Sequence, residues 1–392
     1  MRKSVFVFVA LAAVVPLLVA CTENAPDASG GDSDPRALTV TSGDDACDVS
    51  ADSAPAGTLT FDVTNSGTDV TEFYLLGDDG LRIVGEVENI GPNLSGKLVV
   101  NAPAGDYYTV CKPGMVGEGI RDEFAVSASD EEPEVSESDQ QLIDEAQANY
   151  AAYVEDQSAQ LLEKTTEFVD LYLAGKDDEA RALYPVARTH WERIETVAES
   201  FGDLDPKMDA READVDIAAG EKWTGWHVIE KDLWPADAEA SYQALTPKQR
   251  TFYGDDLLAN TETLHKRVQK LTYTVDQIAN GSRGLLEEVA LGKVTGEEEY
   301  WSHTDLWDFQ ANVDGARVGY EGVKPILEQK DPELATELDA RFRDLQKLLD
   351  AQRAGDGFKT YDQLTPDEVK QLSDAVNALS EPLSRLTAAV LG

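Results

Sequence analysis

The chain has 392 residues, enough for two or three domains, and 42% of them are hydrophobic, which is typical of a folded protein with a core. Asp and Glu number 75 against 33 Lys and Arg, so the formal net charge is −42. Because nucleic acids and anionic lipid headgroups are polyanions, this charge argues against direct binding to either and favours cations as ligands. A solvated acidic surface accounts for most of these carboxylates.

The N-terminus has the layout of an export signal. Two basic residues precede an apolar run over residues 5–20, which is short for a membrane-spanning helix. Small residues directly before Cys21 resemble a bacterial lipobox. We expect residues 1–20 to be a lipoprotein signal peptide, with a lipid on Cys21 and a flexible tether over residues 21–36. An unlipidated signal peptide or an uncleaved anchor is the alternative.

Residues 37–127 show short apolar runs separated by Gly, Asn and Asp. The runs recur about every ten residues, and within them apolar and polar side chains alternate, as at Leu59, Phe61 and Val63. This spacing predicts a β-sandwich of about seven strands.

Residues 128–139 are acidic and nearly free of apolar side chains, which predicts a linker. After it the apolar period changes from two to about 3.6, so residues 140–392 are predicted to be all-α, as one bundle or two fused bundles. The expected helices cover residues 141–174, 180–201, 223–233, 248–278, 297–327, 333–354 and 366–391.

His227 and Glu230 form the first candidate metal site. On a helix, positions i and i+3 share a face, so an imidazole and a carboxylate could bind one ion together. The spacing alone is a weak signal in so acidic a chain, and an ordinary pair on a helix face is the alternative.

Glu192, Glu195 and Glu199 recur at i, i+3 and i+7, which would place three like charges on one helix face. Such charges repel one another unless they are solvated or a cation lies between them, and solvation is the commoner reason. The aromatic-rich residues 300–310 are more typical of core packing than of a site.

Several segments, in order, resemble imelysin-like proteins of the EfeO iron-uptake type. These are residues 190–199, 209–214, 225–231 and 300–312. The resemblance spans residues 140–392 and implies an imelysin-like helical bundle with a metal at its Gly-x-His-x-x-Glu box, here residues 225–230. It implies His227 and Glu230 as the main ligands, Glu192 and Glu195 as further ligands, and Asp255 as a weaker candidate.

The resemblance extends to residues 37–127, which look like a cupredoxin-type domain. A blue-copper centre needs two His, but all four His of the chain lie after residue 189. A second site of Cys47, Glu72, Cys111 and Met115 could still hold copper or iron. The alternative is a disulfide between the two Cys, which is common in exported sandwiches and would exclude that site.

The resemblance also implies a function. The protein would be lipid-anchored at the outer face of the cytoplasmic membrane, capture ferric iron and deliver it to an EfeU-type permease, with an EfeB-type haem peroxidase as a further partner. It would be a binding component and not an enzyme. Ferric iron suits carboxylate ligands, while copper, zinc and calcium are the other candidate metals.

Two other functions remain open from the sequence. One is a metallopeptidase of the imelysin type, although the chain lacks the His-Glu-x-x-His motif of zinc peptidases. The other is a protein that binds an acidic polysaccharide through bridging divalent ions.

Overall fold

The computed structural model describes residues 34–391 apart from 79, 81–82, 116, 118, 130–135, 218–219 and 292. The expected signal peptide, the Cys21 lipidation site and much of the acidic linker lie outside the described residues. Within the part of the chain that is described, no helix combines the length and apolar character needed to cross a bilayer.

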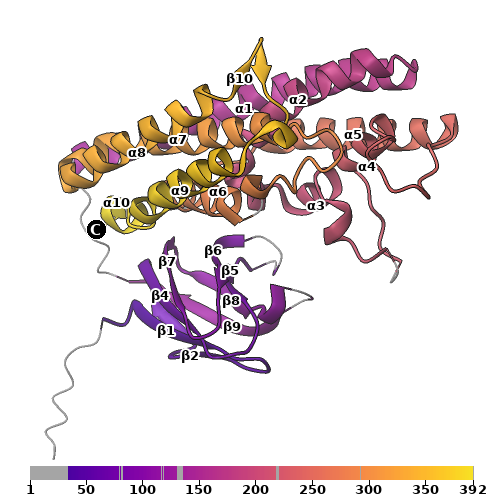
Figure 1. Ribbon diagram of the computed structural model, residues 1–392. Coiled ribbons are helices and arrows are strands. Elements are labelled where there is room, and N and C mark those ends of the chain that lie inside the picture. Colours follow the sequence, from indigo (N-terminus) through magenta and orange to yellow (C-terminus); the bar gives the residue numbers. More distant parts are fainter. Residues whose placement is uncertain are drawn as a thin grey trace, which may run out of the picture. The chain divides into compact units, whose positions relative to one another are not determined.

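The N-terminal part is a sandwich of two sheets, as the alternating pattern predicts (Figure 1). One sheet has the order β2 (Cys47–Val49), β1 (Ala37–Ser42), β4 (Gly57–Asn65) and β7 (Ser95–Ala102). The other has the order β3 (Ser53–Pro55), β9 (Ile120–Ser127), β8 (Gly105–Cys111), β5 (Thr71–Leu76) and β6 (Ile83–Ile90). The inward-facing residues form the core, where the Phe61 ring lies 5.2 Å from that of Phe73 and 5.7 Å from that of Phe124.

A disulfide between Cys47 on β2 and Cys111 on β8 joins the two sheets. The second metal site expected at Cys47, Glu72, Cys111 and Met115 is therefore not formed in this structure, because neither sulfur is a thiolate while the two are bonded. The surroundings of the other two expected ligands, Glu72 and Met115, also differ from those of a metal site. Glu72 is buried and accepts a hydrogen bond from Tyr74, and Met115 is exposed to solvent.

The C-terminal part is helical, and its ten α-helices, counted over the described residues, pack around one large apolar core. Helix α1 packs against α2, α5 and α7, while α6 packs against α7 and α9. The helices are α1 (Glu137–Leu173), α2 (Asp177–Glu192), α3 (Asp205–Met208), α4 (Trp226–Leu233), α5 (Pro247–Val268), α6 (Val275–Leu291), α7 (Asp305–Lys330), α8 (Pro332–Asp350), α9 (Pro366–Leu383) and α10 (Leu386–Leu391).

Helix starts follow the capping rules. Thr246 begins α5 and Thr365 begins α9, each in a capping box with the residue three positions later and with Pro at the first helical turn. Asp331 caps α8 by accepting the N–H of Leu334. These caps confirm the helix starts expected near residues 332 and 366.

Four of the expected helices are broken or begin or end elsewhere in the structure. The one expected over residues 366–391 is two helices, α9 and α10. The one expected over residues 180–201 ends at Glu192 and continues as a 3-10 helix, Glu195–Leu204. The one expected over residues 248–278 is two helices, α5 and α6, because Thr274 begins a new helix by accepting the N–H of Gln277. The one expected from residue 297 begins only at Asp305, since residues 297–304 form a turn with a positive φ of 56° at His303.

Candidate metal centre

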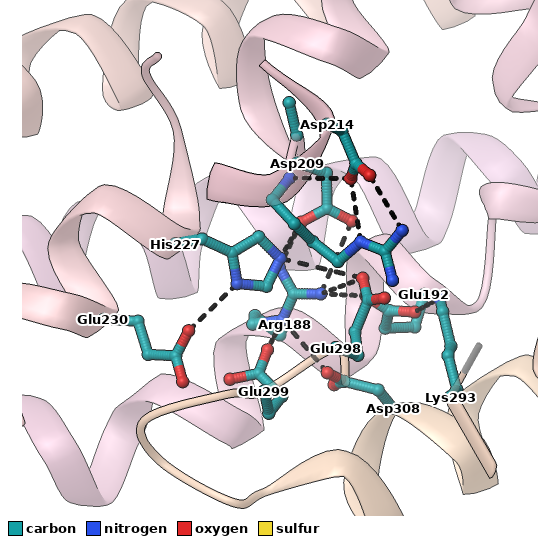
Figure 2. Close-up of polar contacts among 12 residues, drawn as sticks. Arg188, Glu192, Asp209, Asp214, His227, Glu230, Lys293, Glu298, Glu299 and Asp308 are labelled. Atoms are coloured by element: carbon teal, nitrogen blue, oxygen red, sulfur yellow. Dashed lines mark hydrogen bonds and ion pairs between the residues drawn. The ribbon is translucent and has the colours of Figure 1, made fainter. Parts of the chain in front are cut away.

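Side chains from four parts of the helical domain converge on His227 (Figure 2). Helix α2 contributes Arg188, the residue after α3 is Asp209, helix α4 carries His227 and Glu230, and the turn before α7 carries Glu298 and Glu299. All of these side chains are buried. So many ionisable groups out of water require partners or a cation to remain charged.

Gly225 explains how α4 is brought to this position. Its φ of 95° suits glycine, and a Cβ at this residue would lie 2.1 Å from the carbonyl oxygen of Met208. The missing side chain lets the first turn of α4 pack directly against Met208. The residue after Met208 is Asp209, so this contact sets Asp209 beside His227.

Glu230 fixes the orientation of the His227 ring. Its Oε2 lies 3.0 Å from His227 Nδ1, and its Oε1 accepts the backbone N–H groups of Trp301 at 2.9 Å and Ser302 at 2.7 Å. With both oxygens bonded, Glu230 holds the ring from behind, in the position that an orienting carboxylate takes at metal-binding histidines in general. The ring nitrogen left to face the site is Nε2.

His227 Nε2 is a buried nitrogen without a hydrogen-bond partner. The nearest oxygens are Asp209 Oδ1 at 3.5 Å and Glu298 Oε1 at 3.7 Å, which is longer than an ordinary N–H···O bond. Metal bonds of about 2.0–2.2 Å to neighbouring ligands place the ligand atoms about 3.0–3.5 Å apart. These three atoms can therefore close on one ion with small movements.

A second group of three ligand types is formed by His227, Glu230 and Glu299. Here the nitrogen would be Nδ1, which is already bonded to Glu230. Burial raises the pKa of Glu299 well above its usual value, an effect that Glu230 strengthens and Arg188 opposes. Both Glu299 oxygens are already engaged, Oε1 with Arg188 at 2.6 Å and Oε2 with the Ser302 hydroxyl at 2.7 Å, so the group of Asp209, His227 and Glu298 fits an ion better.

Arg188 supplies the permanent positive charge of the site. Its guanidinium is fully buried and pairs with Asp209, Glu192, Glu299 at 2.6 Å and Asp308 at 3.2 Å. Burial alone would favour protonation of Asp209, but Arg188 and His227 outweigh burial and lower the Asp209 pKa. The pKa of Glu298 is likewise lowered against the effect of burial, chiefly by Lys293 and His227. The two carboxylates that face Nε2 thus stay ionised.

His227 itself is held positive in the metal-free protein. Burial lowers its pKa, but the interactions with Glu230 and Glu298 outweigh burial and raise the pKa to about 10. The imidazolium proton therefore occupies the place that a metal would take. An ion can bind Nε2 once that proton leaves.

Comparison with known proteins agrees with this architecture. Residues 146–386 match the imelysin family, which is also called peptidase M75. The iron uptake system component EfeO of Escherichia coli O157:H7 is 36% identical over 353 residues, covering 89% of this chain and 90% of that protein. EfeO of Escherichia coli K12 and of Shigella flexneri are each 35% identical with the same coverage.

The chain belongs to the EfeO family. The family resemblance expected from the sequence is thereby confirmed, as is the order of a β-rich N-terminal part and an imelysin-type helical part.

The structure places the metal ligands expected from the sequence of this EfeO-family chain at different distances from the site. His227 and Glu230 lie together at the centre of the site. Glu192 is buried and Glu195 is partly buried at its edge, where both pair with Lys293 at 2.7 Å. These two carboxylates are therefore paired and not simply solvated, and α2 ends at Glu192, so the row is not one regular helix face. Asp255 lies exposed on α5 and, within the described part of the chain, belongs to neither group of neighbouring ligand atoms.

Sequence reasoning missed Asp209, Glu298, Arg188 and Lys293. Asp209 had a signal, because it begins the segment 209–214 that resembles the family. Glu298 had none, since it is one of three consecutive Glu residues in a stretch that the pattern predicts as helix.

Proposed function

We propose that this protein is the metal-binding component of an Efe-type iron uptake system and that it captures ferric iron at His227, Asp209 and Glu298. The observation that carries the proposal is the buried Nε2 of His227, which has no hydrogen-bond partner and lies between two ionised carboxylates. Hard carboxylate oxygens with one imidazole suit ferric iron. The names of the relatives, which describe an iron uptake component, support iron as the cargo.

The proposal includes delivery and location. Iron would pass to an EfeU-type permease, with an EfeB-type haem peroxidase as a further component. A lipid on Cys21, which lies outside the described residues, would hold the protein at the outer face of the cytoplasmic membrane.

A binding role also fits better than peptidase chemistry. A metallopeptidase needs a carboxylate near the metal that is free to take a proton from water. Glu230 does not fit this task, because its oxygens accept two backbone N–H groups and face Nδ1 of His227. We therefore propose that the protein binds and releases its metal without catalysis.

The test compares metal retention in the full chain and in three variants. Each protein is loaded with equimolar iron, copper, zinc and calcium, desalted and assayed by element-resolved mass spectrometry. His227→Ala and Glu298→Gln should weaken iron binding by at least about tenfold, as expected when a ligand is lost. Glu145→Gln, an exposed position on α1, is the matched control and should retain iron like the parent.

Iron bound equally by the parent and Glu298→Gln would refute the assignment of ligands. Zinc or calcium retained in preference to iron would refute the cargo. Chelator-sensitive cleavage of an unfolded protein substrate would refute the non-catalytic role.

A further inference from the structure

The metal centre opens on one side into a hollow of about 460 Å³. His227 and Glu298 lie at its inner end, and the exposed side chains of Asp237, Glu297 and Tyr300 lie among its outer walls. Three waters that complete the shell of a bound ion would need about 90 Å³, at about 30 Å³ each. The hollow is therefore far larger than the ion's own site requires, and a fully hydrated cation fits inside it.

The walls of the hollow are predominantly negative. Five carboxylates line it, against the guanidinium of Arg211 and the imidazolium of His227: Glu212, Asp237, Glu239, Glu297 and Glu298. The charge of Arg211 is already paired, because its Nε and Nη2 bind the two oxygens of Asp214 at 2.8 and 2.9 Å. A negatively charged guest would meet repulsion on most sides, because the two cations among these lining residues, Arg211 and His227, are already paired with carboxylates.

Lys231 holds two of these carboxylates in place. Its ammonium lies 2.7 Å from Glu212 and 3.1 Å from Glu239, and it is 4% exposed. The rings of Trp223, Tyr242 and Trp301 surround it with their centroids 5.1–5.8 Å away. This cage ties the segments before and after α4 to the helix that carries His227, so the hollow has fixed walls.

Asp237 and Glu297 are the two carboxylates of the outer wall that are available to an incoming cation. Within the described residues, neither side chain has an ion-pair partner. At the inner end, the buried Nε2 of His227 has no hydrogen-bond partner, lies 3.5 Å from Asp209 and 3.7 Å from Glu298, and faces the same space. A cation that enters thus meets two solvated carboxylates first and the nitrogen ligand last.

We propose that this hollow receives the metal as a hydrated cation, which Asp237 and Glu297 attract and hold before it loses water to His227, and that it rejects anionic chelates of the same metal. The inference rests on the proposed function, because it names the form in which that site takes its cargo. Negatively charged walls attract the cation, which raises its association rate and leaves the final bound state unchanged.

The test uses Tb³⁺, a hard trivalent ion whose luminescence is sensitised by nearby tryptophans such as Trp301. Stopped-flow mixing with the full chain gives association and dissociation rates at low and high salt. The variant Asp237→Asn/Glu297→Gln should bind Tb³⁺ about 3- to 10-fold more slowly at low salt, with its dissociation rate unchanged. The control Glu145→Gln/Asp356→Asn makes the same change of charge at exposed positions away from the hollow and should bind within twofold of the parent.

A second experiment supplies Tb³⁺ as a preformed anionic citrate complex. We expect a loading rate that becomes independent of protein concentration, because the complex must release its ion first. A rate that rises in proportion to protein concentration would overturn the inference, as would equal association rates for the hollow variant and its control. If Tb³⁺ does not bind the parent at equilibrium, or binds His227→Ala equally well, the proposed function fails as well. If His227→Ala loses Tb³⁺ binding but the hollow variant and its control associate at equal rates, the inference is overturned and the proposed function still stands.

Discussion

Glu230 and His227 are joined by a 3.0 Å contact between Oε2 and Nδ1, and this bond decides which nitrogen of the ring faces the metal position. The other oxygen of Glu230 is held by the N–H groups of Trp301 and Ser302. The turn before α7 therefore sets the ring of a residue about 70 positions earlier in the chain, as an outer partner of a metal ligand should.

Glu230→Gln tests this relationship with almost no change of shape. The amide oxygen would take the two backbone N–H groups, leaving its NH₂ to face Nδ1. A neutral ring must then accept at Nδ1 and carry its proton on Nε2, where the proton blocks the metal. We expect metal affinity to fall about 10- to 100-fold by calorimetry.

In the metal-free parent both ring nitrogens carry a proton at neutral pH, and nitrogen spectra of the variant with ¹⁵N-labelled histidine show which of the two protons is lost. A ring that keeps its proton on Nδ1 would contradict the prediction even if affinity fell. The control Glu145→Gln should change neither the affinity nor the protonation of the two ring nitrogens.

Metal affinity should depend steeply on pH. The pKa of His227 in the metal-free protein is about 10, so binding at neutral pH must displace one proton. Affinity should therefore rise about tenfold per pH unit between pH 6 and 8, and acidification should favour release. Calorimetry in two buffers of different ionisation enthalpy would count the released proton. A flat profile would show that Nε2 does not bind the metal.

Arg188 is expected to be essential for the fold as well as the site. Arg188→Met would leave Asp209, Glu192 and Glu299 buried around an uncharged side chain, a loss that costs about 3–5 kcal/mol for a buried pair. Urea unfolding at pH 7 should show this decrease in the free energy of unfolding. The control Arg193→Met removes a partly exposed pair with Asp314 and should cost less than about 1 kcal/mol. Equal effects of the two changes would contradict the assigned role.

The fold was largely predictable, because the periodicity of apolar residues is a local property of the sequence. The site was not predictable, because it depends on contacts between residues far apart in the sequence. Thr365 and Pro366 begin a helix through contacts within one turn, and a sequence window contains that information. Glu192 appeared as a member of an acidic row because the windows around it show neither Arg188's partners nor Lys293, which is 101 residues away. Asp209 and Glu298 become neighbours of His227 only through the packing of α4 and the turn before α7, so spacing could not choose them.

His190 should give the helical domain an acid-sensitive stability. The ring is buried and bonded to Gln157, and burial, aided by Arg193, lowers its pKa to about 4 from an ordinary 6.5. Below pH 6.5 the unfolded chain binds this proton and the folded chain does not. The free energy of unfolding should thus fall by up to about 3 kcal/mol as pH drops from 6.5 to 4.

Urea unfolding across this pH range in the parent and in His190→Gln checks the effect, because the variant cannot bind that proton. Its stability should fall less steeply with decreasing pH. Parallel pH profiles for the two proteins would show that His190 does not cause the loss.

The disulfide should stabilise the sandwich without affecting the metal centre. It closes a loop of 64 residues, which by chain entropy corresponds to about 4 kcal/mol. Cys47→Ser/Cys111→Ser should lower the stability of the β-rich part by this order, and iron retention at His227 should stay the same. Copper titration of the oxidised parent gives the complementary result. Because both sulfurs are bonded, we expect no thiolate-to-copper absorption band, and the appearance of such a band would show that the bond opens to bind metal.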